Sequence, residues 1–148
     1  MGTRRQAREI AMQALFYMDM RNNVSIEMLE HFCGNFCPSK KIQPFFLKLV
    51  NGVLGARGEL DALIERFSKN WDITRMSGVD RNVMRIAVFE LIYCDDIPPK
   101  VSINEAVDVG KKFGTEDSGA FINGIMDSIR EELEKAGKLK KKAESQLS

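Results

Sequence analysis

Apolar residues recur at intervals of three and four along almost the whole chain, and no segment alternates between apolar and polar residues with a period of two. The first spacing lines one face of an α-helix, whereas the second is that of a half-buried β-strand. A chain of 148 residues is also long enough to bury a core without disulfides or metals. The sequence therefore predicts an all-α fold, a compact bundle of about seven helices arranged as two small subbundles.

The helix boundaries are marked by capping residues, prolines and glycines. Thr3 with Gln6 and Ser102 with Glu105 form capping-box patterns, in which each side chain satisfies a free backbone N–H group. The expected helices run from Thr3 to about Arg21, from Ser25 to near Gly34, from Pro44 to about Phe67, from Ser77 to about Cys94, from Ser102 to Gly114, and from Thr115 or Ser118 to about Lys135. We expect one domain over residues 1–135, with the subbundles divided near residues 71–77, and a basic, disordered tail over residues 136–148.

Composition narrows the classes of function and the compartment. The net charge of +1 gives no general attraction to nucleic acid, so a nucleic-acid surface would need local segregation of charge. Three cysteines, an odd number, argue against a disulfide framework and favour a reducing compartment. No apolar run approaches the roughly 20 residues of a membrane helix, and the N-terminus lacks the apolar stretch of a secretory signal. We expect a cytoplasmic protein without membrane association.

The residue types that carry enzymatic chemistry are scarce. A single histidine leaves little scope for a nucleophile paired with an imidazole base, and no GxSxG motif occurs. The glycines of segment 51–58 lack the GK[ST] of a phosphate-binding loop. His31, Cys33, Cys37 and Cys94 are enough ligands for zinc, but their spacing is not a zinc-finger pattern, and buried thiols are the commoner outcome. We expect no enzyme, no cofactor and no metal site.

Glu90 lies on the same expected helix face as Val79, Val83 and Ile86. A buried carboxylate is costly unless it accepts hydrogen bonds. One interpretation is a general acid or base, but no second titrating residue stands at a fixed spacing from it. The interpretation we favour is a structural carboxylate that accepts hydrogen bonds from an arginine or from a helix N-terminus.

The first expected helix has two chemically different faces. One face, expected to pack on the core, carries Ala7, Ile10, Ala11, Ala14 and Met18; the other carries Arg4, Arg5, Arg8, Met12 and Phe16. Large apolar groups beside arginines on an exposed face indicate a contact surface. Arginine pairs with phosphate through two parallel hydrogen bonds, and an aromatic ring can stack on an unpaired base. This face predicts binding to single-stranded RNA, with simple solvation of a charged face as the alternative.

A second basic cluster, Lys111 and Lys112, precedes the last expected helix, which carries Phe121. The first turn of that helix presents free N–H groups and the positive end of the helix dipole, so it favours anions such as RNA phosphates. The alternative is that Glu116 and Asp117 themselves occupy this end of the helix.

Two stretches of the chain resemble a known family. The stretch VDRNVMRIAVFELIYCDDIPPKVSINEAVDVGKKFGTEDSGAFINGIMDSI is similar to the C-terminal half of the NusB family, and RRQAREIAMQALFYMD resembles its N-terminal arginine motif. The FFLKLVNGV segment and the tryptophan at position 71 extend the likeness over most of the chain, to about Ile129. The resemblance implies an all-α fold of two small helical bundles.

Carried over position by position, the resemblance also implies two binding faces. The RNA face would include Arg4, Arg5, Arg8, Gln13, Phe16 and Phe121. The partner face would surround the central helix, with Asp80 and Arg81 as candidates, and Asp117 falls at a position associated with modulated antitermination. The chain departs from the family at Phe16, where tyrosine is common, and at Gly119-Ala120, where many members carry a basic residue before the phenylalanine.

The function that the resemblance implies is transcription antitermination. The protein would bind single-stranded boxA RNA of nascent ribosomal transcripts together with NusE, a small-subunit ribosomal protein, and assemble on RNA polymerase. One alternative is the related RNA-recognition module that precedes ribosomal RNA cytosine methyltransferases, which needs a catalytic domain that these 148 residues lack. Another is a helical module that binds only proteins. The sequence leaves open whether the free protein is a monomer or a homodimer.

Overall fold

A computed structural model describes residues 2–69 and 71–139 of the chain. Within these ranges the backbone forms six α-helices and one short 3-10 turn. In chain order they are α1 (Gly2–Met20), α2 (Ile26–Asn35), α3 (Gln43–Phe67), the 3-10 turn η1 (Ile73–Arg75), α4 (Gly78–Tyr93), α5 (Pro99–Phe113) and α6 (Ser118–Lys135). No strand occurs in the described part of the chain, so the expected all-α class with about seven helical segments is confirmed.

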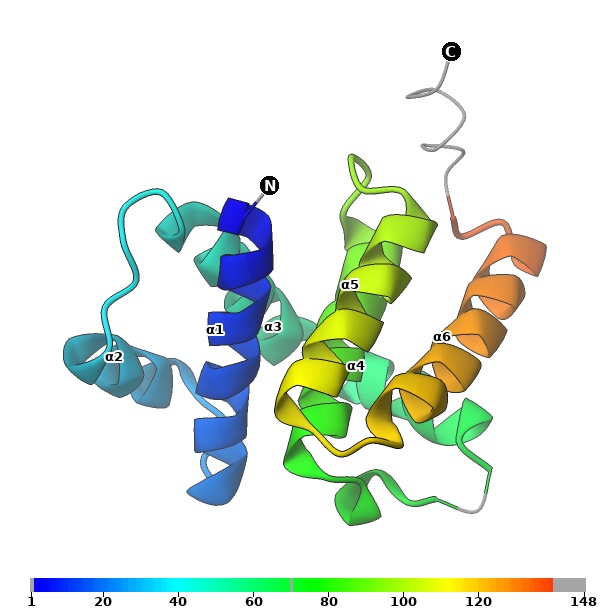
Figure 1. Cartoon of the computed structure of the whole chain (residues 1–148), viewed down its shortest axis with the longest axis horizontal. Coiled ribbons are helices and arrows are strands. Elements are labelled where there is room, and N and C mark those ends of the chain that lie inside the picture. The colour runs from blue at the N-terminus through cyan, green and yellow to red at the C-terminus, as the bar shows by residue number, and fades with distance from the viewer. Residues whose placement is uncertain (1, 70, 140–148) are drawn as a thin grey trace.

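The helices form two groups around a shared core (Figure 1). Helices α1 and α2 lie on one side, α4, α5 and α6 lie on the other, and the long α3 contacts α1, α2, α4 and α6. Buried apolar side chains from both groups belong to one core cluster. The two groups correspond to the expected pair of small subbundles, but α3 contacts both groups, so a division near residues 71–77 stays a prediction.

Helix α4 is the central element of the bundle. It packs against α1, α3, α5 and α6, and all its residues from Asn82 to Leu91 are buried. Such complete burial follows from a sequence that is apolar almost all round the helix, because no face is left that prefers water. Three of the buried residues are nevertheless charged or polar: Arg85, Glu90 and Asn82.

The expected helix starts are confirmed where a serine precedes the helix. The side-chain oxygen of Ser25 accepts a hydrogen bond from the backbone N–H of Met28 (3.2 Å), and that of Ser77 accepts one from Asp80 (3.0 Å). Each bond satisfies one of the free N–H groups at a helix start. Pro44 lies in the first turn of α3, where its missing N–H has no cost.

The expected capping role of Ser102 is wrong. Helix α5 already begins at Pro99, so Ser102 lies inside it, and its hydroxyl donates to the carboxylate of Glu90 (2.8 Å). Pro98 precedes this helix and Pro99 is its first residue, a position that a proline fits well. Thr3 likewise lies inside its helix, since α1 begins at Gly2.

Helix α6 ends at Lys135, where the basic tail was expected to begin. Residues 136–139 of that tail are described and contain no helix, whereas residues 140–148 lie outside the described residues. No helix in the described part is both long and apolar enough to cross a membrane.

The packing of α3 against α4 depends on Gly52, because a methyl group there would overlap the ring of Phe89. We expect Gly52→Ala to lower the free energy of unfolding by about 1–3 kcal/mol, the usual cost of overpacking. The matched control is Gly58→Ala on the exposed part of the same helix, where no atom lies within 4 Å of the added carbon. That change should raise stability by up to about 1 kcal/mol through helix propensity. Urea unfolding followed by circular dichroism checks both, and equal effects of the two variants would contradict the close approach.

Candidate nucleic-acid interface

Helix α1 is buried on two sides rather than one. Its expected core face is correct at Ala7, Ala11, Ala14 and Met18, which are all fully buried. The face expected to be exposed is not: Met12 is 2% exposed and Arg8 is 5% exposed. The reason is that α1 packs against α3 with one face and against α4 and α5 with the other, so both faces lose their contact with water.

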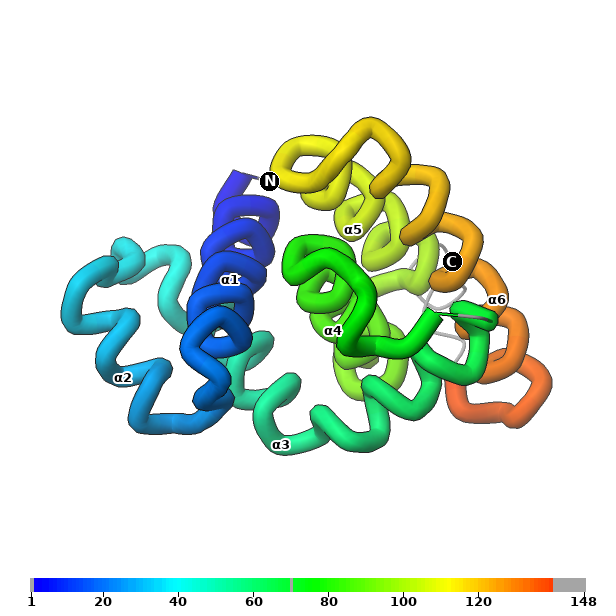
Figure 2. Tube along the Cα trace, turned by 90° about the horizontal axis from the view of Figure 1, so that it is seen from below, coloured from blue at the N-terminus to red at the C-terminus, as the bar shows by residue number. Residues whose placement is uncertain are grey.

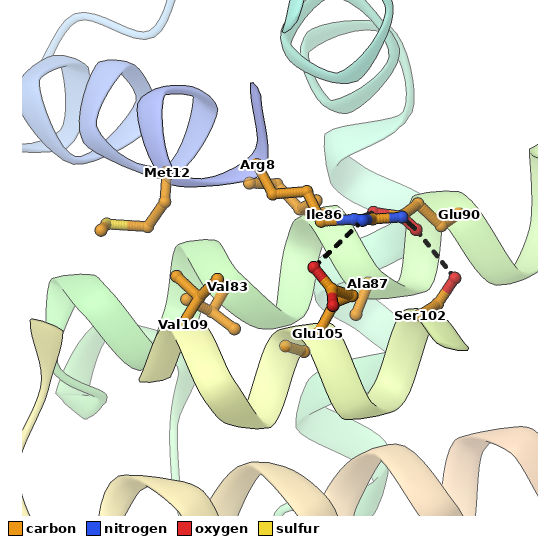
Figure 3. A pocket seen from close by; sticks show the side chains of 10 residues that line it. Arg8, Met12, Val83, Ile86, Ala87, Glu90, Ser102, Glu105 and Val109 are labelled. Atoms are coloured by element: carbon orange, nitrogen blue, oxygen red, sulfur yellow. Dashed lines mark hydrogen bonds and ion pairs between the residues drawn. The ribbon is translucent and has the colours of Figure 1, made fainter. Parts of the chain in front are cut away.

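Arg8 is held in the interior by a set of matched polar groups (Figure 3). Its Nε and Nη2 donate to the two carboxylate oxygens of Glu90 at 2.8 and 2.9 Å, and its Nη1 donates to Glu105 at 3.2 Å. Glu90, which is 1% exposed, also accepts from Ser102. This two-fold pairing of a guanidinium with a carboxylate is the strongest geometry that such groups can form. Glu90 is thus a structural carboxylate paired with an arginine, as we expected from the sequence, rather than a general acid or base.

This buried site has no room for a ligand. The cavity that Arg8, Glu90 and Glu105 line with apolar neighbours measures about 10 Å³, which is at the lower limit for one water molecule. Burial lowers the pKa of the Arg8 guanidinium, but the hydrogen bond and charge of Glu90, aided by Glu105, raise it above its ordinary value. Arg8 therefore stays charged, and its charge is already matched.

The two remaining arginines of the motif are also paired with acids. Arg5 donates to both oxygens of Glu105 (2.6 and 2.7 Å) and to Asp108 (2.9 Å). Arg4 donates to Asp96 (2.9 Å). These two side chains are less buried than Arg8, with about half of Arg4 and a third of Arg5 exposed. An RNA phosphate at this place would have to compete with carboxylates.

Phe16 does not project freely into solvent as expected. It is partly buried and packs against the core, and its ring lies over Gly78 so closely that a Cβ there would approach it to 2.5 Å. Gln13 is partly buried on the same helix. The geometric expectation of an exposed phenyl ring flanked by unpaired arginines is therefore wrong.

The expected RNA residues divide between the two ends of α1. Its first turn, with Arg4 and Arg5, lies at the upper end of the molecule in Figure 1. The last turns of α1, the start of α4, the end of α5 and the start of α6 all lie at the lower end (Figure 1), and Figure 2 views that end directly. Arg4 and Phe16 are about 18 Å apart along the helix axis, from the rise of 1.5 Å per residue. The lower end therefore gathers the other candidates.

The lower end contains an open groove of about 210 Å³. It lies between the segment 71–77, the start of α4 and the start of α6. Its lining consists of Trp71, Arg75, Met76, Ser77, Asp80, Asp117 and Phe121. The rings of Trp71 and Phe121 meet edge to face, with their centroids 6.3 Å apart. Sequence reasoning missed Trp71 and Arg75 as site residues. The signal that could have found Trp71 is that the one tryptophan of the chain stands in a polar connection, where it is half exposed.

Lys111 lies next to Gly119, one of the positions where the chain differs from the family pattern. A Cβ at Gly119 would meet the aliphatic part of Lys111 at 2.8–3.5 Å, so this lysine lies across the first turn of α6. Lys112 instead pairs with Glu9 of α1, at 3.0 Å. Asp117 precedes α6 and is exposed, and its side chain makes no capping hydrogen bond.

The two candidates for the partner face have different surroundings. Asp80 lines the groove, and one of its carboxylate oxygens is buried without a hydrogen-bond partner among the described residues. Arg81 instead points into the bundle, where it donates to Asp19 at 3.0 Å and to the backbone oxygens of Ile73 and Met76. Its guanidinium is thus engaged internally. Among the described residues, no three His, Cys, Asp or Glu side chains gather in a way that could hold a metal ion.

Comparison with known proteins assigns the chain to a family. The model of the NusB family matches residues 5–131. A transcription antitermination protein NusB of Desulfatibacillum aliphaticivorans is 54% identical over 96% of this chain and 99% of its own length. The protein of the same name from Myxococcus xanthus is 49% identical over 91% of this chain and 99% of its own length. The chain belongs to the NusB family. It is therefore a transcription antitermination factor and not an enzyme.

Solved structures of NusB proteins have the same fold. T. maritima NusB is 36% identical, with a TM-score of 0.76 over 87% of this chain and 91% of that one. The NusB chain in a structure of the antitermination factors NusB and NusE with double-stranded RNA is 28% identical, with a TM-score of 0.77 over 89% of this chain and 98% of that one. The resemblance that the sequence carried is thus confirmed for the family and for the fold.

The buried Arg8–Glu90 pair generates a stability prediction for this NusB. We expect Glu90→Ala to lower the free energy of unfolding by roughly 3–5 kcal/mol, because it leaves Arg8 charged and poorly paired in the interior. The control is Arg4→Ala, which breaks an exposed pair and should cost no more than about 1 kcal/mol. The double variant Arg8→Met with Glu90→Leu should recover most of the loss. Urea unfolding measures these free energies. Similar losses of stability in Glu90→Ala and Arg4→Ala would contradict a stabilising role of the buried Arg8–Glu90 pair.

The acid dependence of stability follows from Glu105. A hydrogen bond from Arg5, assisted by Arg8, holds the pKa of the Glu105 carboxyl below its ordinary value of 4.5, against a burial that raises it. The unfolded chain binds this proton at higher pH, so the stability contributed by Glu105 is complete above the ordinary pKa and is lost as the pH falls through the folded one. We expect Glu105→Gln to be less stable at neutral pH and to lose less stability below about pH 4.5.

Urea unfolding at a series of pH values measures this difference. The control is Glu116→Gln, which removes an exposed carboxylate without an ion pair among the described residues. It should keep the pH dependence of the parent protein. A Glu105→Gln variant that is as acid-sensitive as the parent would refute the assignment.

Proposed function

We propose that the chain acts as a scaffold, holding the boxA RNA of a nascent ribosomal transcript together with a NusE-type protein so that RNA polymerase continues through terminators. The groove at the lower end is the observation that carries the proposal. An edge-to-face pair of aromatic rings, Trp71 and Phe121, lies there beside charged groups of both signs. Such rings can stack on a base only when that base is unpaired, which favours a single strand.

Basic groups near the groove are suited to the RNA backbone. Lys111 has no ion pair among the described residues, and its aliphatic chain lies over Gly119 in the first turn of α6. The positive end of the α6 dipole adds a second attraction for phosphate. Lys112, Gln13 and Phe16 extend this face along α5 and α1. Arg4 and Arg5 would join it only by exchanging their acidic partners for phosphates, and Arg8 supports the face from inside.

Acidic groups in the same groove are suited to a protein partner. The buried oxygen of Asp80 that accepts no hydrogen bond among the described residues is costly unless a donor reaches it. Exposed Asp117 lies on the same groove. A basic partner protein would supply such donors, and a solved structure of NusB with NusE and RNA, 28% identical to this chain, supports a joint complex. RNA and partner would then meet at one end of the bundle.

Phe121→Ala tests the proposed RNA contact. We expect it to weaken binding of a single-stranded boxA-like RNA by about 1–3 kcal/mol, the contribution of one stacked base, without a change in helical content. The control is Tyr93→Ala, which removes an exposed aromatic ring from the end of α4 that lies away from the groove. Fluorescence anisotropy with labelled RNA, with and without NusE, gives the affinities.

The competing function is a helical module that binds only proteins, which the paired state of Arg4, Arg5 and Arg8 favours. Salt titration separates the two. Each phosphate contact on a single strand adds about 0.7 to the log–log salt slope, so Lys111→Gln should flatten the slope by roughly that amount. Equal affinity for boxA and for a scrambled or double-stranded RNA, even with NusE present, would refute the antitermination scaffold in favour of the alternative.

A further inference from the structure

The segment 71–77, which we call the groove wall, carries Trp71 and Arg75 into the groove although it has little regular structure. Its one element is the three-residue turn η1, and Trp71 is half exposed. Its internal hydrogen bonds join only residues 72–76 to one another, so they shape the turn but do not attach it to the helices. The position of the wall relative to Phe121 is therefore set from outside the segment.

Arg81 makes two contacts that fix the wall from outside. From α4, its Nη1 donates to the backbone oxygen of Ile73 and to that of Met76, each at 3.0 Å. One guanidinium thus holds both ends of η1. Its Nε donates to Asp19 of α1 at 3.0 Å, so the same group ties the wall to the helix that carries Phe16.

Asp19 is itself fixed by two further side chains of α4. Asn82 donates to it at 2.8 Å and Arg85 at 3.2 Å. Burial raises the pKa of the Asp19 carboxyl, but the hydrogen bond from Asn82 and the charges of Arg85 and Arg81 lower it below its ordinary value. Asp19 is consequently a charged acceptor in a fixed position, and it orients the Arg81 fork.

Helix α3 holds the wall from the other side. The hydroxyl of Ser68 donates to the backbone oxygen of Trp71 at 2.8 Å, and Glu65 accepts from the N–H of Ile73 at 3.0 Å. The Glu65 contact is exposed, whereas Ser68 is 6% exposed and the Arg81 side chain is 15% exposed. A hydrogen bond shielded from water contributes more to order than an exposed one, so Ser68 holds the wall at Trp71 and Arg81 holds it at Ile73 and Met76.

We infer that Arg81, oriented by Asp19, is a positioning residue for the groove: it holds the wall where Trp71 meets Phe121, and it contacts neither RNA nor partner. This inference rests on the proposed function for its effect on RNA, and on the hydrogen bonds of Arg81 for its effect on the wall. It replaces the expectation that Arg81 belongs to the partner face.

Arg81→Lys is the informative variant. Lysine keeps the positive charge beside Asp19, but it lacks the planar guanidinium that donates to two backbone carbonyls and a carboxylate at the same time. We expect it to weaken RNA binding about tenfold, equivalent to about 1.4 kcal/mol. Trp71 is the only tryptophan, so its fluorescence reports on the wall directly. Acrylamide quenching of that fluorescence should increase in Arg81→Lys, because the ring is held less firmly against Phe121.

Arg85→Lys is the matched control. Arg85 is also a buried arginine of α4 bound to Asp19, and its other carboxylate partner is Asp61, yet it makes no hydrogen bond to the wall. Lysine at position 85 keeps a positive charge beside Asp19, which the shorter hydrogen bonds from Asn82 and Arg81 still hold in place. Arg85→Lys should therefore lower the stability to unfolding as Arg81→Lys does, while leaving both quenching and RNA affinity close to those of the parent. The second test variant, Asp19→Asn, should change quenching and affinity in the same direction as Arg81→Lys.

Three outcomes would overturn the inference: unchanged quenching in Arg81→Lys, equal increases in Arg81→Lys and Arg85→Lys, or increased quenching with unchanged RNA affinity. Equal increases in quenching would mean that both variants act through a general loss of stability. Increased quenching with unchanged affinity would mean that the position of the wall does not affect RNA binding. If the parent protein itself fails to bind boxA-like RNA, the proposed function fails. The quenching comparison then still decides whether Arg81 positions the wall.

Discussion

An arginine and a glutamate meet where α1, α4 and α5 join, almost entirely out of contact with water. Either charge alone would be prohibitively costly there, but Arg8 and Glu90 pair through two parallel hydrogen bonds, and Ser102 and Glu105 serve the remaining groups. The paired hydrogen bonds join α1 to α4, and those of Ser102 and Glu105 join α5 to the same site. The start of α4 lines the groove, so this interior pair helps to set the position of one side of the groove.

Signals that lie within a few residues of each other were reliable in the sequence. Ser25, Ser77 and Pro44 sit where helix starts were expected, because a cap needs only its own first turn. The capping-box pattern of Ser102 failed because α5 already begins at Pro99, and inside the helix the Ser102 hydroxyl donates to Glu90, twelve residues earlier. The face of α1 was misassigned for a similar reason: the partner that makes Arg8 a buried residue stands 82 residues away. A buried glutamate and a buried arginine are each unusual, and the hydrogen bonds between Glu90 and Arg8 explain the burial of both.

The groove could not be derived from any one segment. Trp71 comes from a connection, Asp80 from the start of α4, and Phe121 from the start of α6. Family resemblance pointed to Asp80 and Phe121, but their meeting with Trp71 depends on how α4 and α6 pack. Arg81 shows the reverse case, because a charged residue next to a candidate contact was expected to face a partner, and the structure directs it inward to Asp19 and the groove wall.

The acidic partners of Arg4 and Arg5 have a consequence for how such a protein would behave in a cell crowded with nucleic acid. Each guanidinium already interacts with a carboxylate of the same molecule, so a passing polyanion gains little by approaching it. The chain carries almost equal numbers of basic and acidic groups, which removes long-range attraction as well. A transcript would then be selected mainly by the shape and stacking of its bases, with few phosphate contacts, and the bulk of cellular RNA would dissociate quickly.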